Sequence, residues 1–174
     1  MCVLVYYLSM KVEKESGNIR SYATSYSGSL LKNIATLGFI GYLPVAPGTW
    51  GTVSALIFVA CIPLSQTALL VITACGILIG SVAAGTAEKL IGDIDSVHII
   101  IDEFAGFLVS IIFLPHTYGY LVSAFLLFRF FDILKPFPIG RIEKTIKGGA
   151  GIMADDILAG IFTNAALQIW KANF

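Results

Sequence analysis

Seven charged side chains stand within or beside strongly apolar segments between residues 101 and 157. An ionisable side chain is costly in such surroundings, by roughly 2.5–3.5 kcal/mol at the centre of a bilayer on insertion scales. Such residues mark a candidate functional site, and carboxylates beside cations suit the binding of a divalent metal ion and a phosphate. They comprise five acids, Asp102, Glu103, Asp132, Asp155 and Asp156, and two bases, Arg129 and Lys135.

The spacing of these residues is compatible with a shared site. Arg129, Asp132 and Lys135 follow one another at intervals of three, which places them along one side of a helix until the sequence KPFP stops it. Asp102 and Glu103 are adjacent, so their side chains diverge by about 100° on a helix and can flank a groove. We therefore predict that all of them, with Asp156, act in catalysis.

Five carboxylates on one side of the molecule would repel one another. Two like charges 4 Å apart repel by about 4 kcal/mol at an effective dielectric of 20. A bound divalent cation removes this repulsion, and hard carboxylate oxygens favour Mg²⁺. We predict that the five acids Asp102, Glu103, Asp132, Asp155 and Asp156 hold Mg²⁺. The alternative is that an acid simply pairs with Arg129 or Lys135 in a structural salt bridge.

Two glycine-rich stretches are candidates for phosphate binding. The first, APGTWGT at 46–52, immediately precedes an apolar segment, and the second is the GGAG of 148–151. Free backbone N–H groups at a helix start bind phosphate, and threonine hydroxyls add donors, although such a loop can also be a plain helix entry. We expect Asp155 and Asp156 to open the helix that follows the second loop. The predicted phosphate-binding residues are Thr49, Gly51, Thr52 and Gly149.

The composition of the chain indicates a membrane protein. Of its 174 residues, 57% are hydrophobic and 13% are charged, against about 45–50% and 25% in soluble domains. The net charge is zero, so no basic face suggests a nucleic-acid partner. Residues 1–33 are expected to form a loosely ordered polar arm, and residues 34–174 a membrane-embedded domain.

Hydropathy predicts an all-α polytopic bundle of about five apolar segments, preceded by a short N-terminal helix within residues 34–50. The connections at 63–67 and 115–120 carry no charge, whereas ten of the eleven basic residues lie at the other end of the segments. The positive-inside rule then places the charged end, with the acids, in the cytoplasm. The expected apolar segments are 51–63, 68–85, 97–114, 121–134 and 157–170.

Three sequence blocks resemble the motifs of the phosphatidylglycerophosphatase A family over roughly residues 36–162. They are LPVAPGTWGT, then the stretch from Asp95 to the glycine of DEFAG, then FRFFDILKPFPI with GGAGIMADDILAG. Thr52 stands where the family usually has serine, and Glu143 where it usually has aspartate. The resemblance marks Thr49, Asp95, Asp102, Glu103, Arg129, Asp132, Lys135, Asp155 and Asp156 as site residues.

The resemblance implies an Mg²⁺-dependent membrane phosphatase of phospholipid biosynthesis. Such an enzyme converts phosphatidylglycerophosphate to phosphatidylglycerol and phosphate, with its active site at the cytoplasmic face of a bacterial inner membrane. One alternative is a phosphotransferase that moves a lipid head group without releasing free phosphate. Another is a cation transporter, which would distribute its acids through the depth of the membrane.

Overall fold

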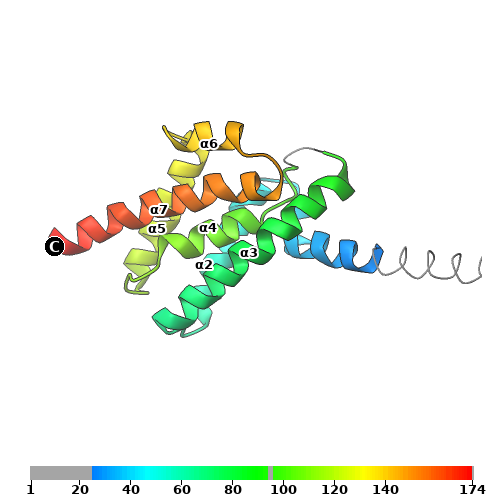
Figure 1. Ribbon diagram of the computed structural model, residues 1–174. Coiled ribbons are helices and arrows are strands. Elements are labelled where there is room, and N and C mark those ends of the chain that lie inside the picture. Colours follow the sequence, from blue (N-terminus) through cyan, green and yellow to red (C-terminus); the bar gives the residue numbers. More distant parts are fainter. Residues whose placement is uncertain (1–24, 94–95, 174) are drawn as a thin grey trace, which may run out of the picture. The chain divides into compact units, whose positions relative to one another are not determined.

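The computed structural model describes residues 25–93 and 96–173, and every regular element in these ranges is a helix (Figure 1). The all-α prediction is therefore confirmed for the described residues. Helical residues 25–35 precede the named elements, and Leu31–Phe174 form one compact unit. The elements are η1 (Ile40–Tyr42), α2 (Pro47–Cys61), α3 (Gln66–Ile91), α4 (Ile101–Ser110), α5 (Tyr118–Leu134), α6 (Ile139–Thr145) and α7 (Gly149–Asn173).

Helices α2, α3, α4, α5 and α7 run alternately between two ends of the bundle. At one end, the side-chain amide of Gln66 donates a hydrogen bond to the Leu114 carbonyl over 3.2 Å. Lys171 Nζ donates to the Phe113 carbonyl over 3.1 Å at the same end. The starts of α2, α4 and α7 lie at the other end, which carries the acidic residues of α4. The uncharged connections thus lie at the end opposite the acidic residues of α4, and Lys171 lies beside them.

Two helices among the described residues are long and apolar enough to cross a membrane. They are α3 with 26 residues and α7 with 25, and α3 reaches roughly 39 Å against about 30 Å of hydrocarbon. Much of the apolar surface of α3 is exposed, including 70% of Leu78. This pattern indicates association with a membrane. The five predicted crossings are not confirmed, because α2 has 15 residues and α4 only 10.

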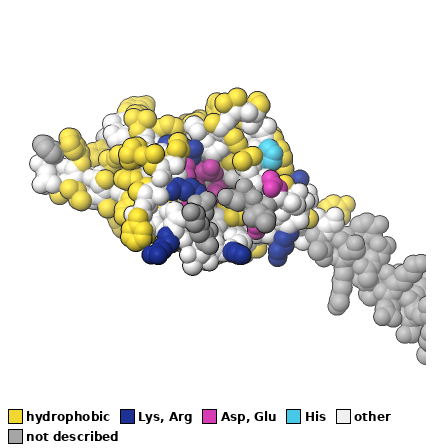
Figure 2. Space-filling model, turned by 90° about the horizontal axis from the view of Figure 1, so that it is seen from above, with side chains coloured by type: hydrophobic (Ala, Val, Ile, Leu, Met, Phe, Trp, Pro, Cys, Tyr) yellow, Lys and Arg dark blue, Asp and Glu magenta, His cyan; other side chains and the backbone are white. Residues whose placement is uncertain are grey.

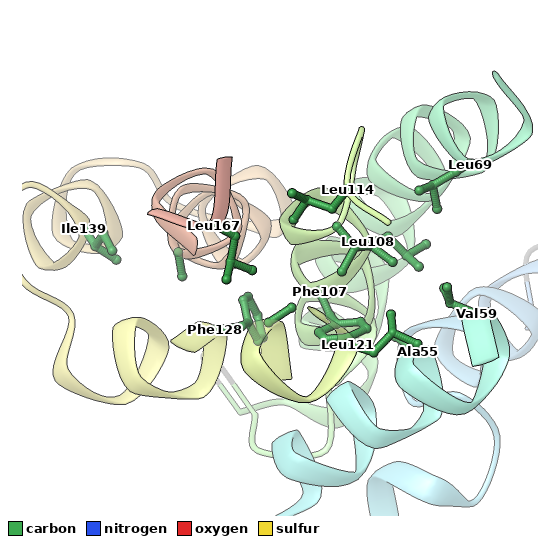
Figure 3. Close-up of a cluster of buried hydrophobic side chains, with 13 residues drawn as sticks. Ala55, Val59, Leu69, Phe107, Leu108, Leu114, Leu121, Phe128, Ile139 and Leu167 are labelled. Carbon is green, nitrogen blue, oxygen red and sulfur yellow. The ribbon is translucent and has the colours of Figure 1, made fainter. Parts of the chain in front are cut away.

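Helix α4 lies at the centre of the bundle and packs against α2, α3, α5 and α7. Figure 3 shows side chains from four of these helices meeting around it. Phe107 is fully buried, and its ring meets the Phe128 ring edge-on with centroids 6.4 Å apart. Ala55 and Leu167 close the same cluster from α2 and α7. The core therefore fixes the position of α4 from all sides.

Glycines bring α4 and α7 into direct backbone contact. A Cβ atom added at Gly160 would lie 2.3 Å from the Gly106 carbonyl oxygen. A Cβ added at Gly106 would lie 2.7 Å from the Asp156 carbonyl oxygen. Real side chains do not tolerate such distances, so the two helices can lie this close only because both positions are glycine.

Side-chain amides of α7 bind carbonyl groups at the far end of α4. Asn164 Nδ2 donates to the carbonyls of Ser110 and Ile112, over 3.1 and 2.8 Å. Gln168 Nε2 donates to the Ile112 carbonyl over 3.2 Å. The last carbonyls of a helix, such as that of Ser110, have no partner within the helix, and the Ile112 carbonyl lies in the turn just beyond it. Residues distant in the sequence supply the partners here, so α4 can end inside the bundle.

Several predicted boundaries are wrong. The predicted apolar segment 97–114 is α-helical only over Ile101–Ser110, because the chain turns where the amides bind its carbonyls. Helix α3 continues to Ile91, through charged residues that were expected to form a connection. The end of a hydrophobic pattern therefore does not mark the end of a helix, because exposed polar residues can continue the same helix into solvent.

Most of the glycine-rich stretch at 148–151 is also helical, with Gly148 just before the helix. Gly149 is the first residue of α7, and a Cβ there would lie 1.9 Å from the Ser81 carbonyl oxygen of α3. The glycines thus serve close packing at the helix start. Asp155 and Asp156 consequently lie about two turns inside α7 instead of opening it. Residues 25–33 of the predicted arm are helical, and residues 1–24 lie outside the described part of the chain.

The contact between α4 and α7 predicts the effect of adding one methyl group. We expect Gly160→Ala to lower the stability of the purified protein by about 1–3 kcal/mol, because the helices must separate. Gly76→Ala in α3 is the matched control, since its Cβ would meet nothing within 4 Å. Thermal unfolding in detergent measures both. Equal unfolding temperatures for the two variants would contradict the contact.

Candidate active site

A pocket of about 240 Å³ opens at the acidic end of the bundle and collects all seven charged residues singled out from the sequence. Figure 2 shows acidic side chains gathered on one face, with Lys and Arg side chains beside them. Helices α4, α5 and α7 contribute the charged side chains, and α2 and the segment before α4 contribute neutral ones. The lining residues are Pro47, Gly48, Ser96, Val97, Ile99, Asp102, Glu103, Arg129, Asp132, Lys135, Asp155 and Asp156.

Asp102 and Glu103 project from the first turn of α4 into surroundings that disfavour their charge. Asp102 is only 9% exposed. Burial raises the pKa of the Asp102 carboxyl, and the neighbouring Glu103 raises it further. Burial also raises the pKa of Glu103. Among the described residues, Asp102 Oδ1 and Glu103 Oε2 find no hydrogen-bond partner. These two oxygens therefore lack the partners that buried carboxylates require, and the other oxygen of Glu103 has only the distant Arg129, 4.0 Å away.

A divalent cation fits these carboxylates. One oxygen from each of Asp102, Glu103 and Asp156 lies within 4.8 Å of the others. Mg²⁺ is bound by hard oxygen ligands, commonly one or two carboxylates with water completing the shell. The two partnerless oxygens and the common approach of three acids supply this donor set. Asp156 is 2% exposed, so this third candidate ligand is buried more deeply than Asp102.

The two bases of the pocket are paired with the other acids. Arg129 Nη1 donates to Asp132 Oδ2, one turn along α5, and lies 4.0 Å from Glu103 Oε1. Lys135 Nζ donates to Asp155 Oδ2 over 2.7 Å. Lys135 reaches this position as the C-cap of α5, where the backbone adopts the left-handed conformation with φ of 42°. Arg129 and Lys135 thus face the pocket from the end of one helix.

Both interpretations drawn from the sequence therefore describe part of the pocket. Structural salt bridges exist at Asp132 and Asp155. Within the trio of Asp102, Glu103 and Asp156, Glu103 lies 4.0 Å from Arg129. With all acids ionised, the lining residues carry three more negative than positive charges. The ion pairs do not balance the charge of the site.

The predicted phosphate-binding residues lie outside the lining of this pocket. Thr52 is fully buried, and its hydroxyl donates to the Gly48 carbonyl over 3.1 Å. A Cβ at Gly51 would lie 2.8 Å from the Ile100 carbonyl oxygen, so this glycine allows α2 to pack against the start of α4. Gly149 packs against α3, as described above. Thr49 follows Gly48 directly and stays a prediction as a phosphate contact.

Gly48 belongs to the pocket and was missed as a site residue. A Cβ at this position would lie 1.9 Å from Glu103 Oε1, so only glycine leaves room for the carboxylate. The APGTWGT motif contains this glycine, but the interpretation of the motif as a phosphate-binding loop named Thr49, Gly51 and Thr52 instead. Ser96 also lines the pocket, and no sequence pattern distinguished it.

His98, in the segment before α4, contacts two residues of η1. His98 Nδ1 lies 2.8 Å from the Gly41 carbonyl oxygen, and its ring stacks on Tyr42 with centroids 4.8 Å apart. The histidine therefore packs against η1 and helps to hold it in place. Asp95 lies outside the described residues, as does the side chain of Glu143.

Comparison with known proteins identifies the family. The family model described as phosphatidylglycerophosphatase A matches residues 33–171, which include the whole pocket. The chain belongs to the phosphatidylglycerophosphatase A family. The resemblance noted in the sequence is thereby confirmed, and the chain is an enzyme of the phosphatase class.

Named relatives cover most of the chain. It is 35% identical to phosphatidylglycerophosphatase A of Haemophilus influenzae, over 79% of this chain and 89% of that one. It is 33% identical to phosphatidylglycerophosphatase A of Escherichia coli, over 78% and 80%. A Bacteroides thetaiotaomicron protein provisionally named phosphatidylinositol-3-phosphatase is 38% identical, over 71% and 82%. No solved structure matches the chain.

The division between metal-binding and ion-paired acids predicts opposite effects on stability. Without divalent cations, we expect Asp102→Asn to keep or raise the unfolding temperature, because it removes a buried carboxyl that lacks partners. Mg²⁺ should stabilise the unsubstituted protein by about 2.7 kcal/mol at a hundred times its Kd, and the variant far less. Phosphatase activity of the variant should fall by several orders of magnitude.

Asp155→Asn is the matched comparison, since it removes the ion pair with Lys135. We expect this variant to unfold at a lower temperature with or without Mg²⁺. If Asp102→Asn were equally destabilised and retained full activity per folded molecule, the metal assignment would be wrong.

Proposed function

We propose that the chain hydrolyses phosphatidylglycerophosphate to phosphatidylglycerol and phosphate in an Mg²⁺-dependent reaction of phospholipid biosynthesis. The observation that carries this proposal is the composition of the pocket. Three acids within reach of one cation stand beside Arg129 and Lys135 at the end of a largely apolar bundle. The names of the Haemophilus influenzae and Escherichia coli relatives support this substrate.

Asp102, Glu103 and Asp156 would hold the metal, with Asp132 and Asp155 completing the acidic wall. When bound, Mg²⁺ supplies positive charge that stabilises the phosphoryl oxygens as charge develops on them. Arg129 and Lys135 bind the same oxygens from the α5 side. Both bases already point into the pocket through their ion pairs, so the phosphate replaces contacts that have ordered them in advance.

The reaction exchanges one P–O bond for another. The oxygen of water bonds to phosphorus, the bond from phosphorus to the glycerol oxygen breaks, and that oxygen leaves with a proton as an alcohol. A pocket aspartate either takes the proton from the attacking water or attacks phosphorus itself before water releases the phosphate.

The proposal also includes the position of the protein in the membrane. Helices α3 and α7 cross a bacterial inner membrane, and α2, α4 and α5 run between the same two ends. The pocket opens at the cytoplasmic face, because the basic residues gather at its end of the bundle. The exposed apolar side chains of α3, such as Leu78 and Val82, face acyl chains.

One observation argues against a cation transporter. Such a protein would carry its acids at successive depths, whereas the five acids here line one pocket. A second phosphatase substrate has direct support, because the Bacteroides thetaiotaomicron relative is provisionally named phosphatidylinositol-3-phosphatase. A phosphoinositide is therefore the competing substrate to test.

The decisive experiment measures phosphate release by the purified protein in detergent. We expect free phosphate from phosphatidylglycerophosphate with Mg²⁺, and a drop to background after chelation. Phosphatidylinositol 3-phosphate and phosphatidic acid are tested in parallel. Faster turnover of the phosphoinositide would replace the proposed substrate. Head-group transfer without free phosphate would identify a phosphotransferase.

The orientation of the bundle predicts an asymmetric labelling pattern. In whole cells, a cysteine introduced at Thr117 should react with an impermeant thiol reagent from the periplasmic side. A cysteine at Lys144 should react only after the inner face is opened. The native cysteines are first replaced by serine, so that only the introduced thiols report. Labelling of both positions from one side would contradict the orientation.

A further inference from the structure

Ser96 is a buried polar residue of the pocket that the proposed mechanism does not use. Its side chain lines the pocket and is only 3% exposed. Among the described residues its hydroxyl finds no hydrogen-bond partner. A buried hydroxyl without a partner is destabilising, and native structures rarely keep one without a reason. A bound substrate can supply the missing partner.

The described residues of the segment before α4 bring no charge to the pocket. This segment contributes Ser96, Val97 and Ile99 to the lining. All charged lining residues come from α4, α5 and α7 instead. A phosphate requires the charged part, so the neutral part suits the uncharged portion of the same molecule.

The neutral wall also leads out of the pocket. Ser96 is buried, whereas the next residue, Val97, is 68% exposed. A substrate anchored by its phosphate among Arg129 and Lys135 would extend along this wall towards the lipid. The first group that it presents there is the alcohol that carries the phosphate. A serine hydroxyl both donates and accepts, which matches an alcohol better than an ionised oxygen.

We propose that Ser96 contacts the substrate by hydrogen bonding a free hydroxyl of the leaving alcohol, and so selects a polyol head group. For phosphatidylglycerophosphate, this group is the secondary hydroxyl of the head-group glycerol. The inference rests on the proposed function and names a specificity contact within the same site. It requires no charge from Ser96 and no change in the metal-binding acids.

The test compares two substrates that differ only at this hydroxyl. One is phosphatidylglycerophosphate, and the other is the analogue in which 1,3-propanediol replaces the head-group glycerol. A neutral hydrogen bond changes kcat/KM by about threefold to tenfold. We expect the unsubstituted enzyme to prefer the hydroxylated substrate by this factor. Ser96→Ala should lose the preference and turn over both substrates at the rate of the analogue.

Ser110→Ala is the matched control, because it removes another fully buried serine hydroxyl outside the pocket. That hydroxyl already donates to the Phe107 carbonyl over 2.6 Å. This variant should keep the substrate preference whatever its stability. Ser96→Cys, nearly the same size as serine but a weak hydrogen-bonding group, replaces Ser96→Ala if the alanine variant does not fold. The cysteine variant should also lose the preference.

The possible failures are distinguishable. An unsubstituted enzyme that is inactive on both substrates overturns the proposed function and this inference together. Activity without a preference for the hydroxylated substrate overturns only the role of Ser96. A preference that survives in both Ser96 variants does the same, as does an equal loss on both substrates. Only a loss confined to the hydroxylated substrate supports the contact.

Discussion

The direct contact between the backbones of α4 and α7 is the constraint on which the site depends. Gly106 and Gly160 remove the side chains that would keep the helices apart. The acids of α4 and Asp156 of α7 consequently come within reach of one cation. The like charges of these acids repel one another at this distance, and this repulsion opposes the helix packing that brings them together. The apolar contacts around Phe107 must therefore hold together a site that destabilises the bundle until a counter-charge is bound.

The two remaining acids of the pocket are paired with bases. Asp132 and Asp155 each hold a base at the edge of the pocket, and these pairs orient Arg129 and Lys135 before a substrate is present. Both partners of each pair keep some access to solvent. The pocket thus combines three acids, Asp102, Glu103 and Asp156, whose negative charge is not balanced, with two cations that are already positioned. This is the charge pattern expected for binding a phosphate together with its metal ion.

The sequence predicted which charged residues lie together better than it predicted the boundaries of the helices. Charged side chains are rare in apolar segments, so Arg129 and Asp102 were conspicuous from composition alone. The end of α4 was not predictable from its own residues, since the apolar run continues beyond Ser110 without a helix-breaking residue. Asn164 and Gln168, more than fifty residues away, fix that end. Gly149 was misassigned to a loop because packing glycines and loop glycines look alike in a sequence.

The shortness of α4 explains how a water-requiring reaction fits within an apolar bundle. Ten residues give roughly 15 Å of helix, and residues 96–100 before it run as non-helical backbone. Such backbone is tolerated at membrane depth only where protein covers it or a polar cavity satisfies it. Here it forms the uncharged wall that carries Ser96. The first turn of α4 then presents Asp102 and Glu103 at the favourable, positive end of the helix dipole. A helix long enough to span would fill the space that the pocket occupies.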